Sequence, residues 1–106
     1  GNGTLGIETG ISDEKNSLPS GFTLGQNYSN PFITETNIDF NVVYSGFVSL
    51  KVFNIEGREV STLVNRKMEP GSYTVPFDAT GLPGGVYYYF MKTAKEMDVR
   101  SMILVK

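Results

Sequence analysis

The feature that most constrains this chain is a run of aromatic and β-branched residues, Val86–Met91, which follows a segment rich in glycine and proline, Gly81–Gly85. Such side chains are the strongest strand formers, and the turn residues before them mark where the strand begins. A strand of this kind is unstable alone in water, so it has to pair with neighbours and bury a face. We therefore expect Val86–Met91 to be the central strand of a sheet.

The turn before this strand is predicted from its residue types. Proline has a fixed φ, so Pro83 suits the second position of a β-turn. We expect Gly84 at the third position, with the positive φ that a type II turn requires there, while Gly85 adds freedom before the strand.

Side chains alternate between the two faces of a strand, and here both faces are apolar. Small antiparallel domains usually expose one polar face. The two expected faces are Tyr87, Tyr89 and Met91, and, opposite them, Val86, Tyr88 and Phe90, which we call the aromatic strip. The strip is either exposed, where it would dock a partner or stack on a sugar ring, or covered by the segment around Tyr28 and Phe32. We favour the covered arrangement.

Composition excludes several classes of function. The 106 residues carry a net charge of −2 with no basic block, which argues against nucleic acid and anionic membrane surfaces as partners. The chain contains no Cys and no His, which excludes disulfides, thiolate nucleophiles, imidazole bases and nitrogen or sulfur metal ligands. No apolar run approaches the ~20 residues of a transmembrane helix.

Short alternating segments recur along the rest of the chain without any helical period. A type I turn is expected at Asn54–Gly57, an exposed connection at residues 65–67, and an edge strand at Pro76, which cannot donate a hydrogen bond to a ladder. Besides Val86–Met91, the expected strands are an edge piece around Phe22 and Leu24 and residues 37–43, 47–54, 58–64, 73–77 and 99–105. About seven short strands predict an all-β fold, an antiparallel immunoglobulin-like β-sandwich.

No constellation of residues predicts catalysis, and we expect no catalytic residue, metal site, cofactor or small-molecule substrate. The carboxylates fall at turns or on outer faces rather than converging on a cleft. Serine has no evident base to activate it. The acidic pairs Asp13–Glu14 and Glu96–Asp98 are too sparse for calcium. Gly84–Gly85 lacks the following helix of a phosphate-binding loop.

Five spaced motifs stand out along the chain: Leu18–Phe22, Gln26–Phe32, Val52–Val60, Gly81–Tyr87 and Met102–Lys106. Together they resemble the type A C-terminal sorting domain of the type IX (Por) secretion system. The resemblance covers roughly residues 18–106, with Ser29 and Phe90 departing from the residues common in the family. The aromatic strip is therefore a feature of this chain rather than a family expectation.

The resemblance implies a sorting domain over residues 18–106, which follows a linker from an upstream cargo domain over residues 1–17. The chain begins at Gly1 without an initiator Met, so we expect a fragment of an exported protein from Bacteroidetes or their relatives, in which Gly1–Gly3 could include a cloning remnant. The implied partners are the type IX translocon and a sortase-like peptidase that cuts in or before the linker. The implied location is the periplasm in transit, then the cell surface or the medium.

Carried over by position, the sorting signal rests on turn glycines, the Asn-Pro segment and the last strand. The candidate residues are Asn30, Pro31, Gly57, Gly71, Gly85, Val86, Tyr87, Met102, Leu104 and Lys106. Two other functions stay open. The architecture also resembles the immunoglobulin-like domain of the flagellar hook-capping protein, a structural assembly module. A carbohydrate-binding accessory domain is the third alternative, and it requires an exposed, coplanar aromatic strip.

Overall fold

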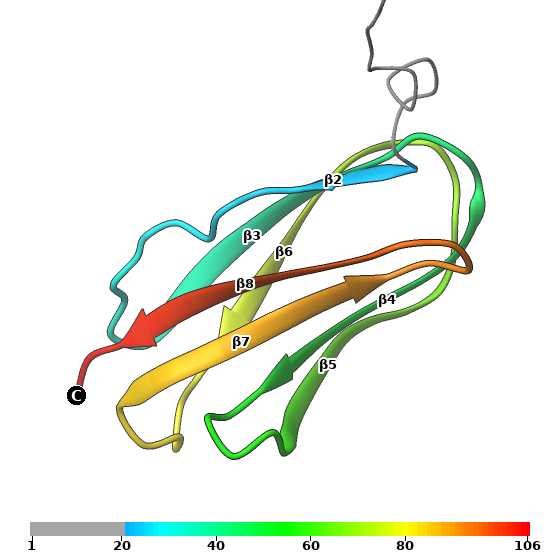
Figure 1. Ribbon diagram of the computed structural model, residues 1–106. Coiled ribbons are helices and arrows are strands. Elements are labelled where there is room, and N and C mark those ends of the chain that lie inside the picture. Colours follow the sequence, from blue (N-terminus) through cyan, green and yellow to red (C-terminus); the bar gives the residue numbers. More distant parts are fainter. Residues whose placement is uncertain (1–20) are drawn as a thin grey trace, which may run out of the picture.

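The computed structural model describes residues 21–106, and the predicted linker at residues 1–17 lies outside them. The described chain forms two antiparallel sheets packed face to face, which confirms the predicted β-sandwich (Figure 1). One sheet has the order β2-β3-β6 and the other β5-β4-β7-β8. The strands are β2 (Phe22–Leu24), β3 (Glu35–Val42), β4 (Gly46–Phe53), β5 (Glu59–Met68), β6 (Gly71–Asp78), β7 (Gly85–Lys92) and β8 (Met97–Leu104).

The aromatic run forms β7, which lies between β4 and β8 and so pairs on both sides as predicted. Its register places Tyr89 opposite Val52 on β4 and opposite Arg100 on β8. The predicted division of its faces is also confirmed. Tyr87, Tyr89 and Met91 are buried between the sheets, whereas Tyr88 remains 36% exposed on the outer face.

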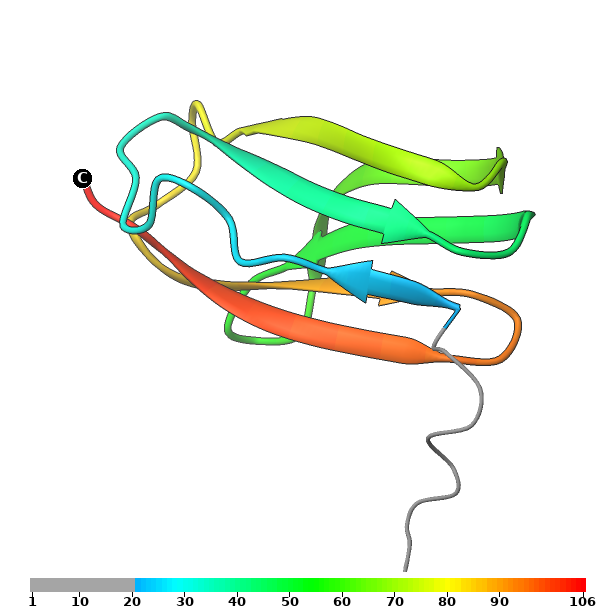
Figure 2. The same ribbon diagram turned by 90° about the horizontal axis from the view of Figure 1, so that it is seen from above.

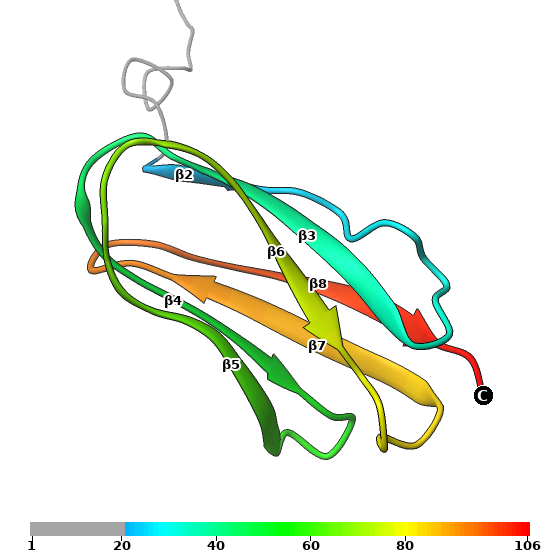
Figure 3. The ribbon, with the colours of Figure 1, turned by 180° about the vertical axis from the view of Figure 1, so that it is seen from behind.

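The core fills the space between the two sheets, which Figure 3 shows from the side of β3 and β6. It is built by alternating inward residues, as the period of two in the sequence predicts. The inward residues are Phe22, Leu24, Ile38, Phe40, Val42, Val64, Met68 and Phe77, together with Val48, Leu50, Val52, Met102 and Leu104 and the inner face of β7.

Two of the predicted turns have different outcomes. The Asn54 turn is confirmed, because the Gly57 N–H donates to the Asn54 carbonyl at 2.9 Å. The predicted positive φ at Gly84 is wrong, because the turn forms earlier, with Gly81 at φ +86°. Gly84 lies in a tight space instead: a Cβ there would lie 3.1 Å from the Lys106 side chain and 3.3 Å from the Leu104 carbonyl oxygen.

Strand β5 is longer than the sequence predicts. We expected the strand to end at Val64, but Asn65 and Arg66 continue the ladder opposite Ser49 and Val48. The chain is extended there because β4 offers backbone partners along its whole length, and Met68 at the end of β5 is buried. Residues 65–67 are exposed, as expected, but within a strand.

Pro76 lies on β6, which is an edge strand of its sheet, as predicted.

The connections between antiparallel strands lie at the two ends of the sandwich. The β4–β5 and β6–β7 connections and the end of β8 lie at one end of the sandwich, and the β3–β4, β5–β6 and β7–β8 connections lie at the other (Figure 1). We call the first of these the β8 end.

Candidate functional site: the β8 end and the outer sheet face

The segment between β2 and β3 lies along the free edge of β8 and closes it (Figure 2). The Phe32 N–H donates to the Ile103 carbonyl at 3.0 Å, and the Val105 N–H donates to the Phe32 carbonyl at 2.8 Å. The Asn30 side-chain oxygen accepts a hydrogen bond from the Ile103 N–H at 2.9 Å. Asn30 and Pro31, both exposed, are thus held against the last strand, from which they are remote in sequence.

Two polar side chains, the Gln26 amide and the Arg100 guanidinium, extend this closure along β8. Gln26 Nε2 donates to the Ser101 carbonyl at 2.9 Å, and the Arg100 Nε donates to the Leu24 carbonyl at 2.8 Å. An open strand edge is a template for pairing with other chains. The segment Gln26–Phe32 therefore supplies β8 with partners that a neighbouring strand would otherwise provide.

The candidate residues of β7 lie directly opposite those of β8. Gly85 pairs with Leu104 and Tyr87 with Met102, and the side chains of the last three are buried. Gly85 has φ +148°, a conformation that other residues adopt only with strain. The Tyr87 hydroxyl donates to the Pro83 carbonyl at 2.6 Å, which ties the strand to its preceding turn.

The structure therefore brings most of the candidate sorting residues to the β8 end, but not all of them with the same exposure. Asn30, Pro31 and Lys106 are exposed there, whereas Val86 is half-buried. Gly57 lies at the same end on the separate β4–β5 turn, with φ +83°. Gly71 does not join them, because it begins β6 at the opposite end.

A buried polar network fixes the Gln26–Phe32 segment and was not predicted from the sequence. The Tyr89 hydroxyl accepts a hydrogen bond from the Asn27 N–H at 2.8 Å and donates one to the Gly25 carbonyl at 2.7 Å. Asn27 Nδ2 donates to the Thr36 hydroxyl, which in turn donates to the Ser29 carbonyl. An inward tyrosine on the central strand is a signal of such a network, because a buried hydroxyl needs partners.

This environment also changes the acidity of Tyr89. Burial raises the pKa of its hydroxyl above the ordinary tyrosine value, because the phenolate would lose its hydration. The Asn27 N–H and the charge of Arg100 lower the pKa, the charge of Asp98 raises it, and the net pKa is above the ordinary value. Tyr89 is therefore neutral at physiological pH. Its hydroxyl holds the backbone of Gly25 and Asn27 by hydrogen bonds and does not act as an acid or base.

The aromatic strip lies on the outer face of the larger sheet and is not covered by the segment around Tyr28 and Phe32. That expectation is wrong for two reasons. Phe32 is buried and packs edge-on against Phe77 of the other sheet at 6.2 Å, and Tyr28 bonds to Asp39 on β3. The backbone pairing between Phe32 and β8 holds the segment at the sheet edge, where it cannot reach the outer face.

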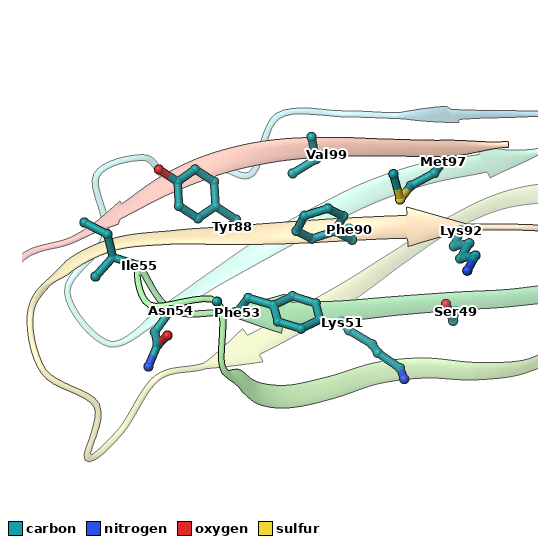
Figure 4. Close-up of a pocket in the computed structure, with 11 residues that line it drawn as sticks. Ser49, Lys51, Phe53, Asn54, Ile55, Tyr88, Phe90, Lys92, Met97 and Val99 are labelled. Carbon is teal, nitrogen blue, oxygen red and sulfur yellow. The ribbon is translucent and has the colours of Figure 1, made fainter.

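Instead, two residues of the strip, Tyr88 and Phe90, line an open groove of about 650 Å³ across β4, β7 and β8, whereas Val86 does not (Figure 4). Tyr88 and Phe90 lie at its centre, and Phe53, Val99 and Met97 flank them. The rings of Phe53 and Phe90 meet at 79° with their centroids 5.2 Å apart. These two rings form a ridge rather than the flat platform on which a sugar ring stacks.

Neither region contains a constellation suited to metal binding. Within residues 21–106 no three carboxylates come close enough together to hold an ion, and the sequence has no His or Cys. The described residues include no helix long and apolar enough to cross a membrane.

Comparison with known protein families matches residues 26–106 to one family model, described as a secretion system C-terminal sorting domain. The match begins at the segment that closes β8 and continues through β8 itself, so it includes both parts of the β8 end. No match was found among proteins with curated descriptions.

Proposed function

This chain belongs to the family of secretion system C-terminal sorting domains, and we propose that its sorting signal is read at the β8 end. The domain is a C-terminal sorting signal of type IX secretion, which directs export across the outer membrane to the cell surface or the medium. Domains of this family are signals rather than enzymes. Our proposal extends to the surface that the secretion machinery recognises and to the removal of the domain by a peptidase.

One observation carries this proposal. Asn30 and Pro31, residues 85–87 and the end of β8 are far apart in the sequence, yet hydrogen bonds and strand register bring them to one end. A receptor that contacts this end tests whether the whole sandwich has formed, because Asn30 meets Ile103 only in the folded domain. The exposed groups that such a receptor would contact are Asn30, Pro31 and Lys106.

The partners in this proposal are the type IX translocon and a sortase-like peptidase. The protein would be in the periplasm during transit, with a cargo domain upstream of the linker at residues 1–17. The peptidase would cut in or before that linker and release the sorting domain. The family match, which begins at residue 26, is compatible with a linker before the sandwich.

The test fuses residues 1–106, with an export signal, to a reporter in a bacterium that has a working type IX system. We expect the reporter at the surface or in the medium, without the sorting domain, and we expect it in the periplasm when the translocon is deleted. A fusion that ends at Asp98 removes most of β8, including the buried Met102 and Leu104, and is expected to remain inside. Surface reporter that keeps the domain would refute peptidase removal while leaving the sorting role intact.

Point variants separate recognition from folding. Asn30→Ala removes the side chain that contacts Ile103, and Asn41→Ala is the matched control on an exposed position of β3. We expect export to fall with Asn30→Ala and to be unchanged with Asn41→Ala, while both purified domains remain folded by circular dichroism. Equal export of the two folded variants would contradict a signal that includes Asn30.

A further inference from the structure

The outer face of the β5-β4-β7-β8 sheet carries a groove that the proposed sorting signal does not use. We propose that this groove binds a short peptide segment of a partner protein, in which apolar residues are followed by carboxylates. The inference goes beyond the sorting role and would stand even if the signal for export lay elsewhere. It depends on two halves of the groove with different chemistry (Figure 4).

The first half of the groove is apolar and accessible. Met97 and Val99 on β8 are 60% and 43% exposed, and Tyr88 on β7 is 36% exposed. Contiguous exposed apolar side chains on a small domain mark interaction sites. The edge-on arrangement of Phe53 and Phe90 gives this half a ridged surface, which fits aliphatic side chains better than the flat face of a sugar.

The second half of the groove is cationic. Ser49 on β4 is directly opposite Lys92 on β7, and Lys51 is two residues further along β4. The two lysines thus occupy diagonal positions, with Cβ atoms roughly 7–8 Å apart or somewhat less. Figure 4 shows Ser49 and Lys51 on β4, on the side of the groove away from β8. Lys92 lies on β7, at the same end of the groove as Ser49 and opposite Met97 on β8.

No carboxylate lines the groove, although the chain as a whole has a net charge of −2. Lys51 has a partner in Glu59 at 3.7 Å, whereas Lys92 forms no ion pair with any residue in the described range 21–106. Two ammonium groups at diagonal positions repel each other. A carboxylate placed between them would offset that repulsion and could accept a hydrogen bond from the Ser49 hydroxyl.

Charge complementarity therefore selects an acidic partner over a symmetric dimer in which two copies of this chain meet groove to groove. A second copy would bring the same two lysines to the interface, with no carboxylate from its own groove. The occupant has to supply apolar side chains over Tyr88, Phe90 and Val99, and carboxylates between Lys51 on β4 and Lys92 on β7. A peptide with an apolar half and an acidic half meets both conditions.

Titration of the isotopically labelled 106-residue chain by NMR tests this proposal. The first probe is a blocked peptide of three leucines followed by three glutamates. In the second, lysines replace the glutamates, and in the third, serines replace the leucines. We expect saturable shifts of the Ser49, Tyr88, Lys92 and Val99 amides with the first probe only.

The variant Lys92→Glu makes the test specific. We expect it to bind the leucine–glutamate peptide about tenfold more weakly, since an attraction becomes a repulsion, and to gain binding of the leucine–lysine peptide. Lys67→Glu is the matched control, because it changes the net charge equally at an exposed position of β5 outside the groove. We expect it to bind all three peptides as the unmodified chain does.

Several outcomes would overturn the proposal. These are equal affinity of the unmodified chain for the first two peptides, equal loss in Lys92→Glu and Lys67→Glu, or shifts that map away from the groove. Groove shifts that depend on protein concentration alone would assign the face to a second copy. Groove shifts with a neutral oligosaccharide and none with the peptides would assign it to a glycan.

Discussion

Removal of the Tyr89 hydroxyl is expected to destabilise the domain far more than its small size suggests. In Tyr89→Phe, the Asn27 N–H loses its acceptor and the Gly25 carbonyl loses its donor. Tyr89 is fully buried and Asn27 is 2% exposed, so water cannot replace the lost partner of the N–H. The segment that closes β8 would then be held less tightly at its start.

The magnitude follows from the cost of leaving a buried polar group unpaired. Each lost hydrogen bond is worth about 1 kcal/mol, and an unsatisfied buried group costs about 1–3 kcal/mol. We expect a loss of about 3 kcal/mol in the free energy of unfolding, which lowers the Tm of a domain this small by roughly 15 °C. Calorimetry and urea unfolding at neutral pH would measure both quantities.

The adjacent variant Tyr88→Phe is the matched control. It deletes the same atom on the same strand, but the Tyr88 hydroxyl makes no hydrogen bond to the described residues and its side chain is partly exposed. We expect a change within about 0.5 kcal/mol, as for ordinary surface substitutions. Equal Tm values for the two variants would refute the role assigned to the Tyr89 hydroxyl.

The raised pKa of Tyr89 adds a pH dependence to this difference. Because the folded state disfavours the phenolate, the stability contributed by the neutral hydroxyl is fully present below the ordinary tyrosine pKa of about 10. It is lost as the pH rises through the higher pKa of the folded state. The difference in unfolding free energy between the unmodified chain and Tyr89→Phe should therefore shrink above pH of about 10. A constant difference through alkaline pH would contradict the assignment.

Two further variants address the β8 end. Asn30→Ala is expected to lower the free energy of unfolding by about 1 kcal/mol. It should also speed amide hydrogen exchange at Ile103, while exchange at the centre of β7 stays unchanged. Unchanged exchange at Ile103 would show that the side chain does not hold β8. Gly85→Ala is expected to cost about 1–3 kcal/mol from backbone strain alone, because φ is +148° and a Cβ would meet nothing within 4 Å. Gly46→Ala, which has neither a positive φ nor a close neighbour, is the control in urea unfolding and should be neutral or slightly stabilising; equal unfolding free energies for the two glycine variants would refute the strain argument.

The strand pattern was predictable because it depends on local chemistry. Alternation in Ile38, Phe40 and Val42 and in Val48, Leu50 and Val52 identifies the inward positions without knowledge of the partner strand, and these six side chains are buried. The end of β5 was not predictable in the same way. Polar residues 65–67 carry no strand signal, and they are extended only because β4 lies beside them.

The residues of the β8 end could be identified from the sequence, but their proximity in the fold could not. Resemblance identified the Asn-Pro segment, the Gly-Val-Tyr run and the last strand. That they lie close together depends on the register between distant strands. Gly84 shows the same limit. Its residue type suggested a positive φ, but in the structure it is distinguished by the close approach of Lys106, which is distant in the sequence.

By itself, the sequence determined the fold class, the central strand and its buried face, and the absence of histidine and cysteine chemistry. These depend on side-chain type and a period of two, both of which are local properties. Only the tertiary structure decided which apolar surfaces stay exposed. The outer face of β7 is open because Phe32 is fixed against β8 and the core, an outcome that depends on hydrogen bonds between segments more than 70 residues apart.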